Sequence, residues 1–363
     1  MPRQPIHSDI IIVGAGLIGL ALARELRRRG ATVTIFEAGE AARQASWAGA
    51  GMLSGRQTTD PRLRPLAMAG ARLYPHWAGE LESETGMSVG YRTGGTLFLA
   101  TTAHPAPDPA PEGWQRLPDA TVAGEEPQLA WRASPGAAVW RIADHSLDNR
   151  ALGAALTRAV RQAGVVLREQ APVEAVTRDA QGLCVRVAGV EQRADIVVNA
   201  AGAWSAALPA PAPAPPVRPR KGHMLSLRSG LPLRHVLETA DVYVVPRAGG
   251  RIVIGSTVED CGFDPTLDAA VLETLRQRAV ALVPALAEVA VEETWCGFRP
   301  GSADDLPIFG PTTCPGYWLA TGHFRDGILL APITAKILAH AMAAGRFTRA
   351  LDCAPFSPAR FGC

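Results

Sequence analysis

Cysteine is scarce in this chain, and its six cysteines stand far apart at Cys184, Cys261, Cys296, Cys314, Cys353 and Cys363. The sequence has no C-x-x-C pair and no His/Cys spacing typical of a metal site. This pattern argues against a zinc site, an iron–sulfur cluster and a disulfide framework. We therefore expect no metal, and a reducing, cytoplasmic location.

An excess of one charge and a long apolar run are also lacking. The 36 Lys and Arg residues nearly balance 34 Asp and Glu residues, for a formal charge of +2. Such a balance gives no field that would recruit a polyanion, so we expect no nucleic-acid partner. The apolar stretch 10–22 is interrupted by Gly14, Gly16 and Gly19, and nothing approaches 18 unbroken apolar residues. We therefore expect neither a signal peptide nor a membrane partner.

The first forty residues read as a strand, a helix and a second strand. Residues 9–13 form a continuous apolar run typical of a buried strand. Residues 17–29 have helical spacing and end at Gly30, where a left-handed cap is easy, and residues 32–37 form the next strand. This order predicts the βαβ start of a Rossmann-type domain.

A glycine-rich motif occupies the turn between this strand and helix, in the order Gly14, Ala15, Gly16, Leu17, Ile18, Gly19. It matches G-x-G-x-x-G, in which the glycines let the backbone approach a pyrophosphate at the helix N-terminus. Glu37 ends the second strand, where its carboxylate can accept hydrogen bonds from ribose hydroxyls. The motif predicts dinucleotide binding rather than a merely tight turn, but it does not distinguish FAD from NAD.

Two stretches rich in proline and alanine, 104–111 and 208–219, separate the remaining elements. Proline lacks an amide donor, so we expect both to be surface connections, the second between domains. A helix at 150–163 and strands at 165–167, 173–176, 184–187, 196–199 and 317–320 extend the nucleotide-binding pattern, and a further apolar helix starts at about 328. Strands at 96–100, 242–246 and 251–254 lie outside it.

The fold class that follows is α/β, or α+β overall. A Rossmann-type nucleotide-binding domain, which in a flavoenzyme would be the FAD-binding domain, is interleaved with a mostly antiparallel β-sheet domain, which would then hold the substrate. The expected boundaries are 1–60, 145–215 and 305–363 for the FAD-binding domain, and 61–144 and 216–304 for the substrate domain.

Five further segments carry a specific resemblance: A-S-W-A-G-A-G-M-L at 45–53, V-N-A-A-G-A-W-S at 198–205, Y-V-V-P-R at 243–247, C-G-F-R-P-G at 296–301 and G-H-F-R-D-G-I-L-L-A-P at 322–332. Together with the glycine motif they follow one another in family order over almost the whole chain. The sequence resembles the glycine oxidases of the D-amino-acid oxidase superfamily, flavoenzymes associated with thiazole synthesis for thiamine.

The resemblance implies a site for non-covalent FAD. Beyond the glycine motif, the residues it assigns to FAD are Glu37, Ala38, Ala45, Ser46, Ala50, Gly51, Met52, Val173, His323, Phe324, Arg325, Asp326, Gly327, Ile328 and Leu329. The last seven would wrap the edge of the isoalloxazine ring. Amides of the helix that follows would stabilise negative charge on the reduced ring. On sequence alone, the segment 44–53 could be a flexible loop and 321–327 a simple connection.

The resemblance also implies three residues at the substrate. Arg299 matches the arginine that pairs with the substrate carboxylate. Arg325 matches a second position that contacts the substrate, and Tyr243 matches the tyrosine of the substrate pocket. From the residues alone, Arg299 could instead form an internal salt bridge, Tyr243 could be a core residue, and Arg325 could lie on the surface. The chain departs from the family pattern at Trp47 and Val258, which leaves the side-chain preference open.

Two other positions have competing interpretations. His323 could be a general base, but we favour a role in packing the flavin or positioning the backbone. Asp144, His145 and Asp148 cluster before a helix, where a metal site could be considered. An N-cap with a helix-start charge explains them better.

The implied reaction is oxidative deamination of glycine, sarcosine or a small D-amino acid. A hydride would pass to flavin N5, and the products would be an imine or oxo acid, ammonia and hydrogen peroxide, with molecular oxygen as second substrate. The alternatives are an FAD-dependent amino-acid dehydrogenase with another electron acceptor, and the FAD module of a tRNA-modification protein. A homo-oligomer is compatible with the sequence.

Overall fold

The predicted βαβ unit opens the fold. In a computed structural model that describes residues 8–108, 110–131, 135–347 and 350–363, strand β1 (Ser8–Val13) leads into helix α1 (Leu17–Arg28) and strand β2 (Val33–Phe36). Leu20 and Leu22 of α1 are completely buried. Gly30 follows the helix with φ +88°, a backbone conformation that suits glycine. The apolar spacing of this segment therefore places its helix against the sheet.

Around β1 the chain builds an eight-stranded sheet. Its main path runs β17-β18-β11-β1-β2-β8, and β9 and β10 continue from β11 as an antiparallel hairpin. The pairs between β18, β11, β1, β2 and β8 are all parallel. The added strands are β8 (Val166–Arg168), β9 (Val173–Asp179), β10 (Gly182–Val187), β11 (Val190–Asn199), β17 (Ile308–Pro311) and β18 (Tyr317–Thr321).

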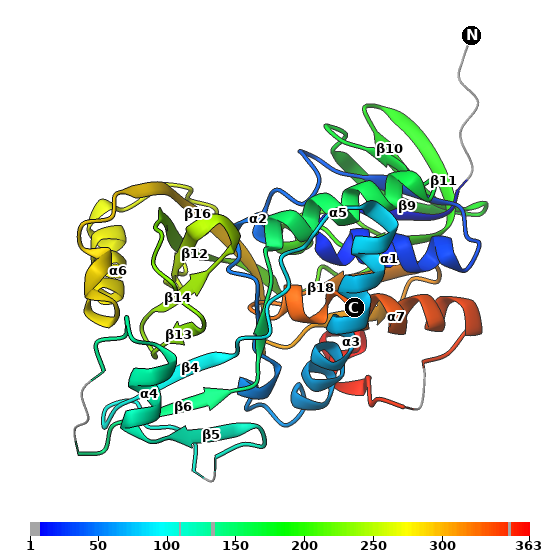
Figure 1. Ribbon diagram of the computed structural model, residues 1–363. Coiled ribbons are helices and arrows are strands. Elements are labelled where there is room, and N and C mark those ends of the chain that lie inside the picture. Colours follow the sequence, from blue (N-terminus) through cyan, green and yellow to red (C-terminus); the bar gives the residue numbers. More distant parts are fainter. Residues whose placement is uncertain (1–7, 109, 132–134, 348–349) are drawn as a thin grey trace.

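Four helices share one hydrophobic core against this sheet. Besides α1 they are α3 (Arg64–Thr85), α5 (Asn149–Gln162) and α7 (Gly327–Ala344). Figure 1 shows α1 and α7 side by side, with α3 running across both of them. Helix α7 is long and apolar enough to cross a membrane, but 61% of it is buried inside the protein. Its apolar character is therefore that of a core helix.

A second eight-stranded sheet lies beside the first (Figure 1), in the order β16-β12-β15-β14-β13-β4-β6-β5. Apart from the parallel pair of β13 and β4, its neighbours are antiparallel, which confirms the mostly antiparallel sheet predicted for this part. Its strands are β4 (Thr96–Ala100), β5 (Trp114–Leu117), β6 (Ala138–Ile142), β12 (Val217–Arg228), β13 (Val236–Glu238), β14 (Tyr243–Pro246), β15 (Arg251–Gly255) and β16 (Val291–Ser302).

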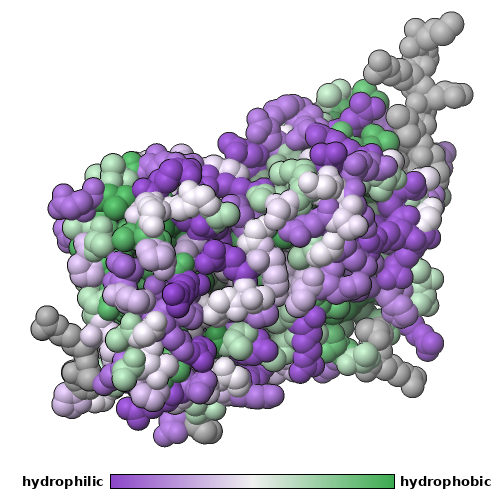
Figure 2. Space-filling model, in the orientation of Figure 1, coloured by the Kyte–Doolittle hydropathy of each residue, from purple (hydrophilic) through white to green (hydrophobic). Residues whose placement is uncertain are grey.

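The remaining elements complete the described chain. They are the helices α2 (Ala45–Ala48), α4 (Asp119–Glu125) and α6 (Ala269–Leu282), the paired strands β3 (Met52–Leu53) and β7 (His145–Ser146), and the single turns η1 (Gly55–Gln57), η2 (Gly202–Trp204), η3 (Ala248–Gly250), η4 (Pro284–Leu286), η5 (Ala354–Phe356) and η6 (Pro358–Phe361). The face in Figure 2 is covered mainly by polar side chains, with apolar ones in scattered groups.

One prediction about the proline-rich stretches was wrong. The second stretch, 208–219, was expected to lie outside any sheet, but strand β12 begins at Val217, and Pro219 pairs in register with Pro300 of β16. Neither proline has an amide hydrogen, so the two residues exchange no N–H···O bonds. The antiparallel register of β12 and β16 nevertheless continues on both sides of this pair. Pro109 of the first stretch lies outside the described residues.

Candidate active site

A cavity of about 570 Å³ is lined by residues from both sheets and their connections. One wall is the start of α1 with the segment that contains α2 and β3, and another is the start of α7. Residues of β13, β14 and β16 and of the connection after β15 contribute the side that faces the second sheet. Segments predicted separately from sequence motifs therefore meet at one place.

The start of α1 faces this cavity through Gly16, Leu17 and Ile18. The Leu17 amide donates to Ser46 Oγ at 3.0 Å, which ties the glycine motif to α2. The first amides of a helix have no acceptors within it, and its dipole favours negative charge there. This end of the cavity is therefore suited to a pyrophosphate.

The glycines of the motif fit close backbone packing. Gly14 has φ +105°, and a Cβ there would lie 2.5 Å from Ala200 O. A Cβ on Gly19 would lie 2.1 Å from Gly14 O. Gly16 is different, because a Cβ there would meet only Ser46 Oγ, at 3.4 Å, and would enter the cavity. Gly14 and Gly19 thus shape the turn, and Gly16 keeps the space beside it open.

Glu37 holds the backbone of the same turn. Its Oε2 accepts from the Ala15 amide at 2.7 Å and its Oε1 from the Gly39 amide at 2.9 Å. Glu37 itself does not line the cavity. The same holds for six other residues predicted to surround FAD, which are Gly14, Ala15, Gly19, Ala38, Val173 and Leu329. Their assignment to FAD stays a prediction.

The start of α7 is a second helix N-terminus directed at the cavity. Phe324, Arg325, Asp326, Gly327 and Ile328 all line it. Phe324 has φ +43°, and the chain turns there into the helix at Asp326. Burial raises the pKa of Asp326 to about 6. The free amides of this helix can stabilise negative charge on a bound ring.

His323 precedes this helix and is 2% exposed. Burial lowers its pKa to about 3, so the ring is neutral at ordinary pH. Its Nε2 lies 3.2 Å from Thr334 Oγ1, and the ring stacks on Phe309. These contacts support the predicted packing role.

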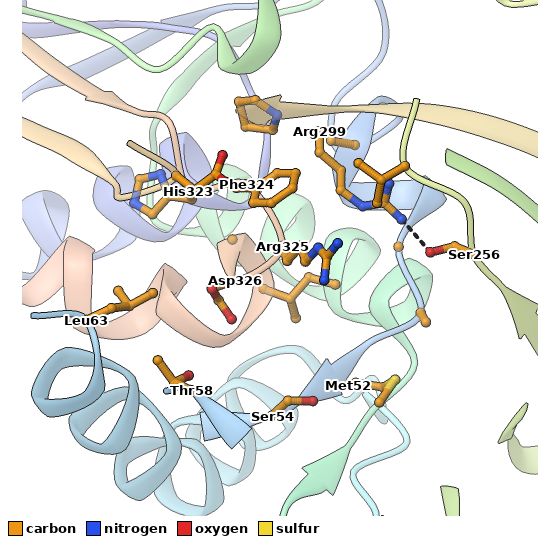
Figure 3. Close-up of a pocket in the computed structure, with 18 of the residues that line it drawn as sticks. Met52, Ser54, Thr58, Leu63, Ser256, Arg299, His323, Phe324, Arg325 and Asp326 are labelled. Carbon is orange, nitrogen blue, oxygen red and sulfur yellow. Dashed lines mark hydrogen bonds between the residues drawn. The ribbon is translucent and has the colours of Figure 1, made fainter. Parts of the chain in front are cut away.

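Arg299 reaches the cavity from β16. Its Nη1 donates to Thr257 O at 3.1 Å and its Nη2 to Ser256 Oγ at 2.7 Å (Figure 3). Within the described part of the chain it forms no salt bridge, so the alternative of an internal salt bridge receives no support. Burial lowers the pKa of its guanidinium. A half-buried positive charge held only by neutral oxygens is suited to bind an anion.

Tyr243 lies beside this guanidinium. It faces the cavity from β14, and its hydroxyl is close enough to favour the charged form of Arg299. The hydroxyl donates to Met224 Sδ at 3.3 Å, a weak acceptor. The tyrosine is therefore part of the wall rather than a core residue.

Arg325 enters the cavity from the opposite side. Its side chain is exposed and lies over the Phe324 ring, 5.2 Å from its centroid. Figure 3 shows Arg299 and Arg325 extending toward the same space. The structure thus brings together all three residues predicted at the substrate.

The other predicted features divide between the cavity and its surroundings. Val258 lines the cavity, whereas Trp47 does not. The Trp47 ring instead packs against Arg150, whose Cζ lies 3.4 Å from the ring centroid. Asp148 caps α5 by accepting from the amides of Arg150 and Ala151, which confirms the N-cap. No group of three His, Cys, Asp or Glu residues suited to a metal occurs among the residues that the structure describes.

Sequence reasoning missed several residues of the site. Ser256 and Thr257, which hold Arg299, lie in the connection after β15 and have no motif of their own. Glu238 and Gln57 also line the cavity. The one available signal for Glu238 is its position five residues before Tyr243 at the end of an apolar strand.

The site fits FAD. Two helix N-termini face one cavity, a Cβ at Gly14 or Gly19 would collide with the backbone of the turn, and Gly16 leaves room beside the first helix. The cavity residues among those predicted for FAD are Gly16, Leu17, Ile18, Ala45, Ser46, Ala50, Gly51, Met52, His323, Phe324, Arg325, Asp326, Gly327 and Ile328.

Comparisons with known proteins agree with this geometry. The family described as DAO, FAD dependent oxidoreductase, matches residues 9–341. A glycine oxidase of Pseudomonas aeruginosa is 36% identical over 96% of this chain and 98% of its own length. The crystal structure of glycine oxidase from Geobacillus kaustophilus superposes with a TM-score of 0.87 at 33% identity, covering 97% of this chain and 98% of the other.

A bifunctional protein ThiO/ThiG of a Nostoc species is 38% identical over 91% of this chain. The match covers 52% of that relative, so the chain spans about half the length of the bifunctional proteins it resembles.

Proposed function

Because this chain belongs to the DAO family of FAD dependent oxidoreductases, we propose that it oxidises the carbon–nitrogen bond of a small amino acid. The observation that carries the proposal is Arg299, a guanidinium in the cavity whose bonds go to Ser256 and Thr257 and to no carboxylate among the described residues. Glycine, sarcosine and small D-amino acids are the substrates we expect.

Arg299 binds the α-carboxylate of the substrate. The Thr257 carbonyl and the Ser256 hydroxyl fix its planar fork, so little side-chain freedom is lost on binding. Two parallel N–H···O bonds would then set the orientation of the α-carbon. Tyr243 narrows the pocket beside this contact, and Arg325 lies at the opposite side.

The substrate amine must be neutral to react, because its lone pair drives removal of hydrogen from the α-carbon. Neutral His323 is bonded to Thr334 and is no base for this step. The chemistry that FAD supplies when bound is acceptance of a hydride at N5 and delivery of the electrons to oxygen. The imine product hydrolyses to an oxo acid and ammonia.

Oxygen consumption with stoichiometric hydrogen peroxide tests the proposal. Purified FAD-loaded protein should consume oxygen with glycine, sarcosine or D-alanine. Turnover with an artificial electron acceptor but no oxygen uptake would identify the dehydrogenase alternative. Salt-sensitive RNA binding without amino-acid turnover would favour the tRNA-modification alternative.

The wider role follows from the same relatives. The bifunctional ThiO/ThiG proteins support a supply of oxidised glycine to thiazole synthesis for thiamine. We propose that FAD is held without a covalent bond, so acid precipitation should release all of it. A cytoplasmic protein, without nucleic-acid or membrane partners and compatible with a homo-oligomer, remains our expectation from the sequence.

Replacing Glu37 by alanine should weaken FAD binding by about 1.5 to 3 kcal/mol, the scale of hydrogen bonds to a charged group. The change removes the acceptors of the Ala15 and Gly39 amides and the carboxylate proposed to bind ribose. The FAD dissociation constant measures it. Glu40→Ala is the matched control, because Glu40 is exposed and contacts Arg43. Equal constants for wild type and Glu37→Ala would remove Glu37 from the cofactor site.

Replacing Tyr243 by phenylalanine should leave most of kcat and raise KM, at a cost of about 0.5 to 1.5 kcal/mol in substrate affinity. The reason is that its hydroxyl shapes the pocket and offers one neutral hydrogen bond. Steady-state kinetics measure both parameters. A fall in kcat of several orders of magnitude would instead give Tyr243 an acid–base role.

A further inference from the structure

Glu238 is a carboxyl group in the wall of the cavity that the proposed reaction does not use. It ends β13, and in the antiparallel pair of β13 and β14 it lies directly opposite Tyr243. Opposite residues of such a pair share one face of the sheet, so both side chains face the cavity, which both line. Arg299 and Glu238 thus lie on either side of Tyr243.

The polar atoms at this end of the cavity lack partners. Glu238 Oε2 and Gln57 Nε2 are buried without a hydrogen bond to any described residue, and so is Oδ2 of nearby Asp144. A structural carboxylate is normally bonded through at least one oxygen, as Glu126 is: its Oε2 accepts from the Arg234 and His235 amides, although its Oε1 has no partner among the described residues. The carboxyl group of Glu238, which lines the cavity and has one oxygen left unbonded, can accept a hydrogen bond from a donor on a ligand.

The charges around Glu238 set its ionisation. Its pKa is raised to about 7, chiefly by burial; the nearby Gln57 side chain and the Arg325 charge lower this pKa, and the Asp144 charge raises it. Glu238 is therefore ionised above neutral pH and becomes protonated as the pH falls below it. A ligand that brings a positive charge would stabilise the ionised form.

We propose that Glu238, with Gln57, forms a subsite for a cationic group of the substrate at the end remote from its α-carboxylate. The inference rests on the proposed function, because Arg299 must hold the carboxylate for the opposite end to be defined. Amino acids with a short cationic side chain would then be preferred over apolar ones of equal length, whereas glycine would leave the subsite empty.

Ligand pairs that differ only in the distal group test this subsite without turnover. They are β-alanine with propionate, 4-aminobutyrate with butyrate, and 5-aminopentanoate with pentanoate. Binding is measured on the FAD-loaded enzyme from the change in the flavin absorption spectrum. At one chain length or more, the amine should bind about ten-fold more tightly than its apolar partner, as expected for a charge-assisted hydrogen bond.

Two variants assign the preference to Glu238. Glu238→Gln keeps the shape but not the charge, and should bring the affinity ratio close to one while leaving butyrate binding unchanged. Asp241→Asn removes a charge from an exposed residue of the same cavity and should keep the wild-type ratio. The wild-type ratio should also grow as the pH rises from below to above 7, because Glu238 then loses its proton.

The outcomes separate this inference from the proposed function. Three results would each overturn the subsite. The first is an affinity ratio near one for the wild type at every chain length. The others are a preference for the amine that survives in Glu238→Gln, and a loss of preference in Asp241→Asn as large as that in Glu238→Gln. If no carboxylate of either series perturbed the flavin spectrum, the Arg299 contact and with it the proposed function would fail. Turnover of D-2,4-diaminobutyrate relative to D-norvaline, whose apolar side chain has the same length, should follow the same ratio across the variants.

Discussion

Arg299→Ala should lower kcat/KM for small amino acids by an amount that corresponds to a loss of about 3 to 5 kcal/mol in transition-state stabilisation, because it leaves the substrate carboxylate unpaired in a water-poor pocket. FAD content should remain that of the wild type, because the variant changes no residue predicted to bind the cofactor. The measurement is kcat/KM for glycine, sarcosine and D-alanine, with the flavin content determined by absorbance.

Arg299→Lys provides the matched comparison. It should recover only part of the loss, since an ammonium cannot make the two parallel hydrogen bonds of a guanidinium. For a simple amine without a carboxylate, wild type and variant should have similar values of kcat/KM, because neither can use the missing contact. Wild-type efficiency of Arg299→Ala on every amino acid would reassign the carboxylate contact, with Arg325 as the next candidate.

Substitutions in the glycine motif should separate folding from FAD binding. Gly14→Ala adds a Cβ 2.5 Å from Ala200 O at φ +105°, so we expect about 2 to 5 kcal/mol less stability, together with loss of FAD. Gly16→Ala has space in the protein without FAD, but its methyl group enters the cavity. That variant should fold normally and bind FAD about 1 to 3 kcal/mol more weakly.

Gly30→Ala is the control for backbone strain. Gly30 has φ +88° but nothing within 4 Å of a Cβ, and it lies outside the cavity. It should lose a smaller amount of stability than Gly14→Ala and keep full FAD content. The measurements are denaturant unfolding of the protein without FAD and FAD titration. Equal FAD affinity for wild type and Gly16→Ala would contradict the placement of the cofactor at this turn.

The sequence was most informative where local patterns determine structure. The apolar run before Gly14, the helical spacing after it and Glu37 at the next strand end each follow from short-range rules, and the observed βαβ unit confirms them. The resemblance located Arg299, Tyr243 and Arg325 in separate segments, and the structure brings them into one cavity.

Features that depend on long-range pairing were not predictable in this way. Pro219 suggested a connection, but its pairing with Pro300 needs the register of two strands about eighty residues apart in sequence. Helix α3 was missed, although it is the longest of the helices described. The contacts of Arg299 with Ser256 and Thr257 arise only when β15 and β16 flank β12.

Anaerobic reduction of the bound flavin by a small amino acid tests the central claim most directly, because it needs neither oxygen nor a particular electron acceptor. Glycine, sarcosine or D-alanine should bleach the FAD absorption of the wild-type protein, and oxygen should restore it with release of hydrogen peroxide. Arg299→Ala should bleach slowly at the same amino-acid concentration. Fully loaded wild-type protein whose flavin stays oxidised with every amino acid tested would contradict the proposed function.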